Sequence, residues 1–292
     1  MNQEKLKDLW EETLASPDIE RFGSVAQAVV EAYKNNAGFR VHIKNRSDRV
    51  TARTGVAFDA DNFDIGSARA YIADEIGFTG WTDLIGAIKD AGGIPILFSY
   101  AVAAMDRGDF TSLEEAVGPE RFYEQILEWF ERGLFESEKE TLNEIFAAAC
   151  MLGQTSTAEY LLEKGVDPYA GMKTGLAGFH YAASSGRLDV IRMLIERGIT
   201  PEVKNMYGGT VFEQAIWSAV NEYTPDHAEI VEKLIEARAI FDVGYREWWD
   251  EQDVPDIETK DRIASVLERH ERTLLKSALQ KNKSDGKTHI HQ

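Results

Sequence analysis

Cysteine is almost missing from this chain: Cys150 is the only one among 292 residues, which excludes an internal disulfide framework. No apolar run approaches the roughly 18 consecutive residues that a membrane-spanning helix needs. The first residues also lack the basic and then apolar pattern of a secretory signal peptide. We therefore expect a soluble, cytoplasmic protein with no membrane segment.

Motifs of catalysis and cofactor binding are missing as well. The sequence has no Walker loop, no dinucleotide-binding glycine fingerprint, no HExxH zinc motif and no nucleophile elbow. Its six histidines are scattered, and Cys150 stands in an apolar stretch between Ala149 and Met151, which favours a small buried thiol over a nucleophile. We accordingly expect no enzyme, no metal site and no cofactor.

Positive charge is scarce, with 32 Lys and Arg against 50 Asp and Glu and a net charge of −18. Such a balance excludes non-specific nucleic-acid binding, which needs a field of lysine and arginine. It suits association with a protein partner that has a basic surface, because complementary charge speeds encounter. The carboxylates could equally serve only to keep an extended fold in solution, and both interpretations stay open.

A repeat is the strongest feature that is present. Gly133, Gly165 and Gly198 each follow a charged helix ending, at intervals of 32 and 33 residues, and Gly153 and Gly186 also lie 33 apart. A fixed period near 33 with paired helices is typical of a stacked solenoid. Such folds bind along an extended surface, because each repeat contacts only its neighbours.

Residues 175–198 carry the clearest copy of the repeat. Ala177-Gly178-Phe179-His180 takes the place of a Thr-Pro-Leu-His sequence, and an Ala-Ala-x-x-Gly turn is intact at 182–186. The segment resembles an ankyrin repeat. The resemblance implies a structural role for His180, which would cap backbone groups inside the array.

Neighbouring segments extend the resemblance. Residues 145–168 are similar but looser, and the unit that ends at Arg238 carries seven extra residues at 220–226, between its two helices. Residues 68–81 resemble a pattern that precedes the array in some bacterial ankyrin-repeat proteins, with Asp74 where an arginine is expected.

One amino-terminal stretch, 38–62, differs from the rest. Phe39, Val41 and Ile43 alternate with polar residues, which predicts a strand or an extended loop. Basic residues gather there, and they could meet a phosphate or an acidic surface, or pair with the chain's own carboxylates: Arg40, Lys44, Arg46, Arg49 and Arg53.

The predicted architecture is mainly α, an ankyrin-repeat α-solenoid of about four helical hairpins between added ends. A helical amino-terminal domain occupies 1–93, the glycine-rich linker signal of 91–95 marks its boundary, and the repeats occupy 94–245. A carboxy-terminal cap covers 246–280, with one of Trp248 and Trp249 covering the open end of the solenoid and the other exposed or held by the following segment. Residues 281–292 are predicted to be a disordered tail.

The leading functional hypothesis is a non-catalytic protein–protein interaction module. Its contacts would come from hairpin tips and from the exposed face of inner helices: Tyr169, Met172, Lys173, Tyr181, Ser184, Lys204, Met206, Tyr207, Gln214 and Trp217. One alternative is an acidic inhibitor, an immunity or anti-defence protein that occupies a basic surface of a target enzyme. Another is an enzyme or small-ligand binder at the junction of the amino-terminal domain and the repeats.

Overall fold

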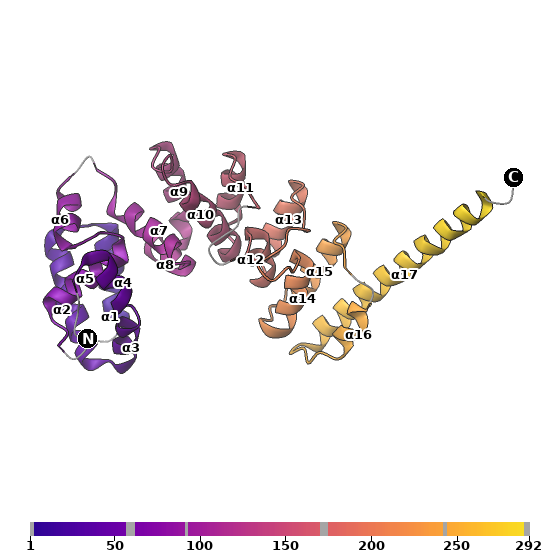
Figure 1. The fold of residues 1–292 in the computed structure, drawn as a ribbon, viewed down its shortest axis with the longest axis horizontal. Helices are drawn as coiled ribbons and strands as arrows, with labels where there is room; N and C mark the ends of the chain where they lie inside the picture. The colour runs from indigo at the N-terminus through magenta and orange to yellow at the C-terminus, as the bar shows by residue number, and fades with distance from the viewer. Residues whose placement is uncertain (1–2, 57–61, 91–92, 170–174, 242–243, 289–292) are drawn as a thin grey trace. The chain divides into compact units, whose positions relative to one another are not determined.

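The structure is a computed structural model, and it describes residues 3–56, 62–90, 93–169, 175–241 and 244–288. Within these ranges every regular element is a helix, which confirms the predicted fold class (Figure 1). The chain divides into two compact units, Met1–Ile145 and Phe146–Gln292, and the division falls inside helix α10 (Lys139–Leu152).

The amino-terminal unit is a bundle of short helices. In chain order they are α1 (Gln3–Ala15), α2 (Ile19–Asn35), α3 (Ala37–Lys44), α4 (Ser47–Thr54), α5 (Ile65–Ile76), α6 (Trp81–Lys89), α7 (Ile96–Asp106), α8 (Phe110–Val117), the 3-10 turn η1 (Pro119–Arg121) and α9 (Phe122–Glu131). Helix α2 packs on α1, α3 and α5, and α5 packs on α7. Fully buried side chains such as Phe22 of α2 and Ile72 of α5 form the core between them.

Residues 37–54 correct the prediction of a strand or extended loop, because α3 and α4 are helical. The Asn36 side chain accepts the Phe39 N–H at 2.9 Å and so starts α3 as an N-cap. Phe39 and Ile43 lie four residues apart on one helical face, with Ile43 fully buried, whereas Val41 is 57% exposed. The alternation of Phe39, Val41 and Ile43 with polar residues was therefore a short stretch of a helical pattern. Residues 57–61 of the predicted segment lie outside the described residues.

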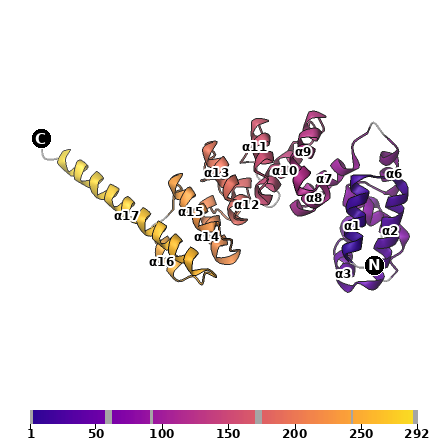
Figure 2. The same ribbon diagram turned by 180° about the vertical axis from the view of Figure 1, so that it is seen from behind.

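The carboxy-terminal unit stacks helical hairpins. After α10 come α11 (Thr155–Glu163), α12 (Gly178–Ser184), α13 (Leu188–Glu196), α14 (Val211–Asn221), α15 (His227–Glu236), α16 (Tyr245–Asp250) and α17 (Ile257–Thr288). The inner helix α12 packs on α14, and the outer helices α11, α13 and α15 pack in series. Figure 2 shows the same succession of hairpins from behind.

Successive hairpins end in the same backbone conformation. Gly165 and Gly198 have φ angles of 85° and 73°, in the left-handed region that favours glycine. Arg238 ends the third outer helix with φ 65°, and it is the one non-glycine residue with positive φ in the described part of the chain. The last repeat thus keeps the left-handed turn after its outer helix, although arginine stands there in place of glycine.

One of the two adjacent tryptophans at the carboxy-terminal end is buried. Trp249 is fully buried and its Nε1–H donates to the Lys260 carbonyl at 3.0 Å, whereas Trp248 is 39% exposed. Helix α17 packs on α15 and α16 and continues to Thr288, which includes residues 281–288 of the segment predicted to be a disordered tail. No proline interrupts 257–288, and its lysine and glutamine residues favour helix. Residues 289–292 lie outside the described residues.

Candidate binding groove

The hairpins of the carboxy-terminal unit enclose a groove of about 750 Å³. Its lining comes from α12, α14 and the turns beside them, including Leu176, Tyr181, Ser184, Asn205, Tyr207, Glu213, Gln214, Trp217 and Glu222. Two carboxylates and three large aromatic side chains face it, and its described lining residues include no lysine or arginine. The groove is therefore both aromatic and acidic.

Half of the predicted contact residues meet in this one groove. They come from the inner helices and one hairpin tip: Tyr181, Ser184, Tyr207, Gln214 and Trp217. Tyr207 is 83% exposed and Trp217 is 49% exposed, so both side chains keep solvent-accessible surface that a partner could contact.

The other predicted contact residues lie outside the lining. Met206 is 64% exposed, Lys204 is exposed, and Tyr169 is 41% exposed. The Tyr169 hydroxyl accepts the Thr200 N–H at 3.0 Å, which ties it to the next hairpin. Met172 and Lys173 lie outside the described residues.

An Asn205 turn holds the hairpin tip that presents Tyr207. The Asn205 Oδ1 accepts the backbone N–H groups of Tyr207 at 3.0 Å and of Gly209 at 2.9 Å. The Asn205 N–H in turn donates to the Gly209 carbonyl at 2.8 Å. Because the backbone is closed on itself, the Tyr207 ring is presented from a fixed support.

Helix α14 begins with a capping box that also fixes a charge in the groove. The Thr210 N–H donates to Glu213 Oε2 at 2.7 Å, and the Tyr245 hydroxyl donates to Glu213 Oε1 at 2.7 Å. Burial alone would raise the pKa of Glu213, but these hydrogen bonds hold its pKa below the ordinary value. The carboxylate therefore stays ionised at neutral pH.

His180 has the structural role that the sequence predicted. Its Nδ1 accepts the Ala177 N–H at 3.3 Å, so its Nε2 carries the proton and donates to the Gly209 carbonyl at 3.2 Å. Burial lowers the pKa of His180 and keeps the ring neutral. The histidine thus joins one repeat to the hairpin tip of the next.

His227 forms a second joint that the sequence reasoning missed. It is fully buried, its Nδ1 accepts the Thr224 N–H at 2.9 Å, and its Nε2–H donates to the Ala183 carbonyl at 3.1 Å. The extra residues at 220–226 therefore fold back on the previous repeat, where Thr224 packs against Gly186. A Thr-Pro-x-His spacing from Thr224 to His227 was the signal that could have revealed it.

The basic residues of the amino-terminal stretch pair mainly with the chain's own carboxylates. The side chains of Asp74 and Glu75 in α5 are 0% and 11% exposed. Four arginines, called here the arginine cluster, contact them within 3.4 Å: Arg46, Arg49, Arg53 and Arg107. Arg40 instead donates to the Tyr33 and Lys34 carbonyls at the end of α2. Of the two interpretations, internal pairing is the one that the contacts favour.

Chemistry-bearing groups are few in the described ranges. Cys150 is fully buried, and burial raises the pKa of its thiol, so it is held as the unreactive thiol form. Among the residues that the structure describes, no three histidine, cysteine or carboxylate side chains gather as a metal site. No helix in those ranges combines the length and the apolar character that crossing a bilayer requires.

Comparison with known proteins agrees with this geometry. A family model described as ankyrin repeats in three copies matches residues 101–205 and 145–245. A stretch of 93 residues, 32% of the chain, is 31% identical to part of the E3 ubiquitin-protein ligase hecd-1 of Caenorhabditis elegans. The chain spans about 3% of that relative's length. Repeating hairpins, a capping histidine and the family match together identify residues 101–245 as ankyrin repeats.

Proposed function

We propose that the chain is a protein-binding module whose groove, formed by α12, α14 and the Asn205 turn, receives a segment of a partner protein. The observation that carries the proposal is the pair of exposed rings, Tyr207 and Trp217, on the lining of one groove. Exposed aromatic side chains on a fixed backbone are the residues that most often supply binding energy at interfaces.

The negative charge of the groove favours a partner segment that carries positive charge. Glu213 and Glu222 line the groove, and the whole chain carries a net charge of −18. A lysine or arginine of the partner could pair with a carboxylate while its stem or guanidinium stacks on Trp217. The partner that fits is therefore a protein segment with basic residues beside apolar ones.

The same charge supports a narrower role as an acidic inhibitor that occupies the basic surface of a target enzyme. This alternative differs from the first in what binding does, because the target would lose activity on binding. That the chain itself acts without catalysis, in the cytoplasm, stays a prediction from the sequence, as does the likeness of residues 68–81 to bacterial ankyrin-repeat proteins.

A photo-crosslinking experiment tests the groove. A benzophenone side chain in place of Tyr207 should crosslink to a partner from the native source, at a segment that contains lysine or arginine. Trp217→Asp should abolish capture of that partner, and the matched control Trp248→Asp, an exposed tryptophan of α16, should keep it.

The melting temperature distinguishes lost binding from lost folding. Both tryptophans are partly exposed, so we expect each variant to melt within a few degrees of the wild type, since exposed substitutions usually change stability by about 0.5 kcal/mol or less. Equal capture by Trp217→Asp and Trp248→Asp would refute the groove as the binding site. Inhibition of the captured enzyme would favour the inhibitor role.

A further inference from the structure

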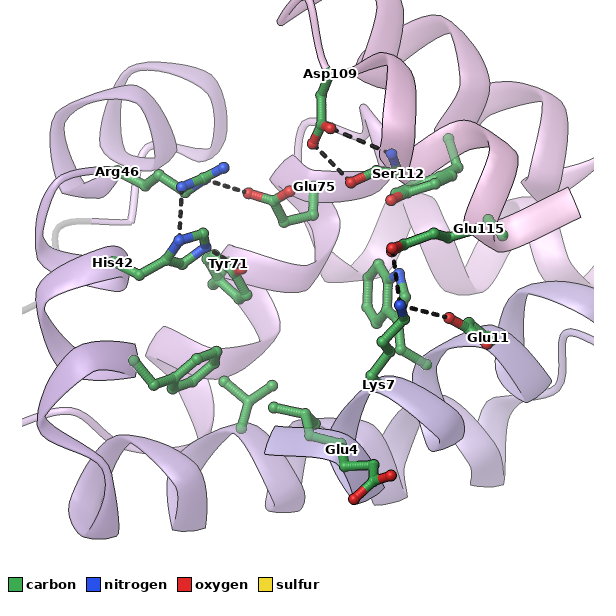
Figure 3. Close-up of a pocket in the computed structure, with 16 residues that line it drawn as sticks. Glu4, Lys7, Glu11, His42, Arg46, Tyr71, Glu75, Asp109, Ser112 and Glu115 are labelled. Atoms are coloured by element: carbon green, nitrogen blue, oxygen red, sulfur yellow. Dashed lines mark hydrogen bonds and ion pairs between the residues drawn. The ribbon is translucent and has the colours of Figure 1, made fainter. Parts of the chain in front are cut away.

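The amino-terminal unit holds a pocket of its own, whose lining Figure 3 shows. It measures about 540 Å³, within the roughly 300–1,000 Å³ typical of small-molecule sites. Leu6, Trp10, Val29 and Phe39 supply apolar surface from α1, α2 and α3. Polar and charged groups from α1, α3, α5, α7 and α8, and from Asp109 before α8, line the remainder, so the pocket offers surfaces of both kinds to one ligand.

Positive charge collects beside its polar end. The arginine cluster brings four guanidinium groups to only two carboxylates, those of Asp74 and Glu75. Arginine remains protonated under all ordinary conditions, so the group keeps two formal positive charges. Arg46 and Glu75 both belong to this group and line the pocket.

The hydrogen bonds at the polar end of the pocket leave the Tyr71 O–H available as a donor. Arg46 Nη1 lies 3.0 Å from His42 Nδ1, and because arginine can only donate, Nδ1 accepts and the proton sits on Nε2. His42 Nε2–H then donates to the Tyr71 oxygen at 3.3 Å. The Tyr71 O–H, on a side chain only 8% exposed, is thereby directed to another acceptor.

Burial and the nearby Arg46 lower the pKa of His42, which agrees with a neutral ring. Arg46 donates Nε–H to Glu75 at 3.1 Å and Nη1–H to His42, so its Nη2 group can serve a further acceptor. Tyr71 and Arg46 together present donors of the kind that one carboxylate group accepts.

Five carboxylates line the pocket, and all except Glu4 have a hydrogen-bond or ion-pair partner, with Glu11 lying 3.7 Å from Lys7. Glu75 accepts from Arg46, Glu115 lies 2.8 Å from Lys7, and Asp109 accepts the Ser112 hydroxyl at 2.8 Å. In Figure 3 Glu4 points away from this group. A cationic ligand would compete with Lys7 or Arg46 for the paired carboxylates, whereas an anionic acceptor would meet the Tyr71 and Arg46 donors.

We propose that this pocket binds a small amphipathic carboxylic acid. The carboxylate accepts hydrogen bonds from the Tyr71 hydroxyl and Arg46, and the apolar body lies on Leu6, Trp10 and Phe39. This site is separate from the groove of the ankyrin repeats and takes a different class of ligand.

Isothermal titration calorimetry on the full chain tests the proposal with three probes of one length: decanoate, decanol and decylamine. Decanoate should bind at least tenfold more tightly than the other two, because only it combines the apolar body with an anionic acceptor. Decylamine or decanol binding as tightly as decanoate would overturn the proposal. So would the lack of saturable decanoate binding at about 1 mM.

Three variants place the ligand in the pocket. Tyr71→Phe removes the donated O–H and should weaken decanoate binding about tenfold or more. The matched control Tyr100→Phe alters a tyrosine of the same lining whose hydroxyl bonds to Ser112, and it should change binding less than twofold. Ala116→Trp fills the pocket and should abolish binding.

Circular dichroism and thermal melting of each variant separate loss of the site from loss of the fold. A folded Tyr71→Phe variant that binds decanoate as the wild type does would refute the assigned contact. A folded Ala116→Trp variant that still binds would place the ligand elsewhere and overturn the site.

Discussion

The replacement Arg238→Gly should stabilise the last ankyrin repeat. Arg238 has φ 65°, and its N–H donates to the Ile235 carbonyl at 3.0 Å. Gly198 has the same backbone conformation and hydrogen bond one repeat earlier, with φ 73° and an N–H donated to the Ile195 carbonyl at 2.9 Å. The two positions therefore differ chiefly in whether a Cβ atom is present.

The size of the effect follows from the backbone. A left-handed conformation costs an L-residue roughly 1–2 kcal/mol, and glycine loses about 0.5–1 kcal/mol more chain entropy on folding. The net gain from Arg238→Gly should therefore be about 1 kcal/mol. The Arg238 side chain is exposed, so its removal costs little packing. A gain of this size corresponds to an increase of roughly 2–4 °C in the melting temperature for a unit of about 150 residues.

Urea denaturation followed by circular dichroism measures the change, and Gly198→Ala provides the converse. A Cβ built on Gly198 meets no atom within 4 Å, so this variant isolates the backbone cost and should lose about 1 kcal/mol. Hydrogen exchange of the α15 amides should slow in Arg238→Gly, since repeats can open separately. An unchanged or lower urea midpoint for Arg238→Gly would refute the reasoning.

Four further outcomes are expected. His227→Ala should cost about 2–5 kcal/mol in urea denaturation, because it leaves the Thr224 N–H and a buried carbonyl without partners, whereas the exposed Asp226→Ala should be near neutral. Burial lowers the pKa values of His180 and His227 below the ordinary 6.5, so the stability that these neutral rings contribute is complete above pH 6.5 and is lost as the pH falls below it. The urea midpoint at about pH 5.5 should therefore lie below the midpoint at about pH 7.5. Equal midpoints at the two pH values would contradict this prediction. Cys150 should react with a thiol reagent only in denaturant, and rapid labelling of the native chain would disprove its burial. Glu75→Ala should destabilise the amino-terminal unit by about 2–3 kcal/mol, measured by calorimetry, since it leaves the partly buried Arg46 and Arg107 without their carboxylate partner.

Local signals in the sequence predicted the repeats well. Helices α9, α11 and α13 are each followed by a charged residue and then a glycine, and the period of these endings places the hairpins without any knowledge of contacts. The predicted role of His180 and the burial of one of the two adjacent tryptophans followed from the same repeat logic.

The failures of prediction were of two physical kinds. For residues 38–62, the strand prediction relied on three alternating apolar residues and overlooked the N-cap at Asn36. The spacing of Phe39 and Ile43 fits a helix equally well. The other kind involves partners distant in sequence. Arg49 and Glu75 lie 26 residues apart, and no local pattern indicates that they meet.

The groove was only partly predictable from the sequence, because some of its properties also depend on contacts between residues that are distant in sequence. Tyr207 and Trp217 were identified by their places in the repeat, but Glu213 was not, because its charge is maintained by contacts with Thr210 and Tyr245. Such contacts depend on how α14 meets the segment after the last repeat, which the sequence does not display.

The joints between repeats have a consequence for how this chain can change over time. Arg187, His180 and His227 each donate to a main-chain carbonyl of a neighbouring repeat. A main-chain carbonyl is present whatever the side chain of the accepting residue, so that residue can mutate while the joint persists. Side-chain substitutions at the accepting residues therefore leave the hydrogen bond of each joint in place, so the stacking of the repeats tolerates sequence change on that side.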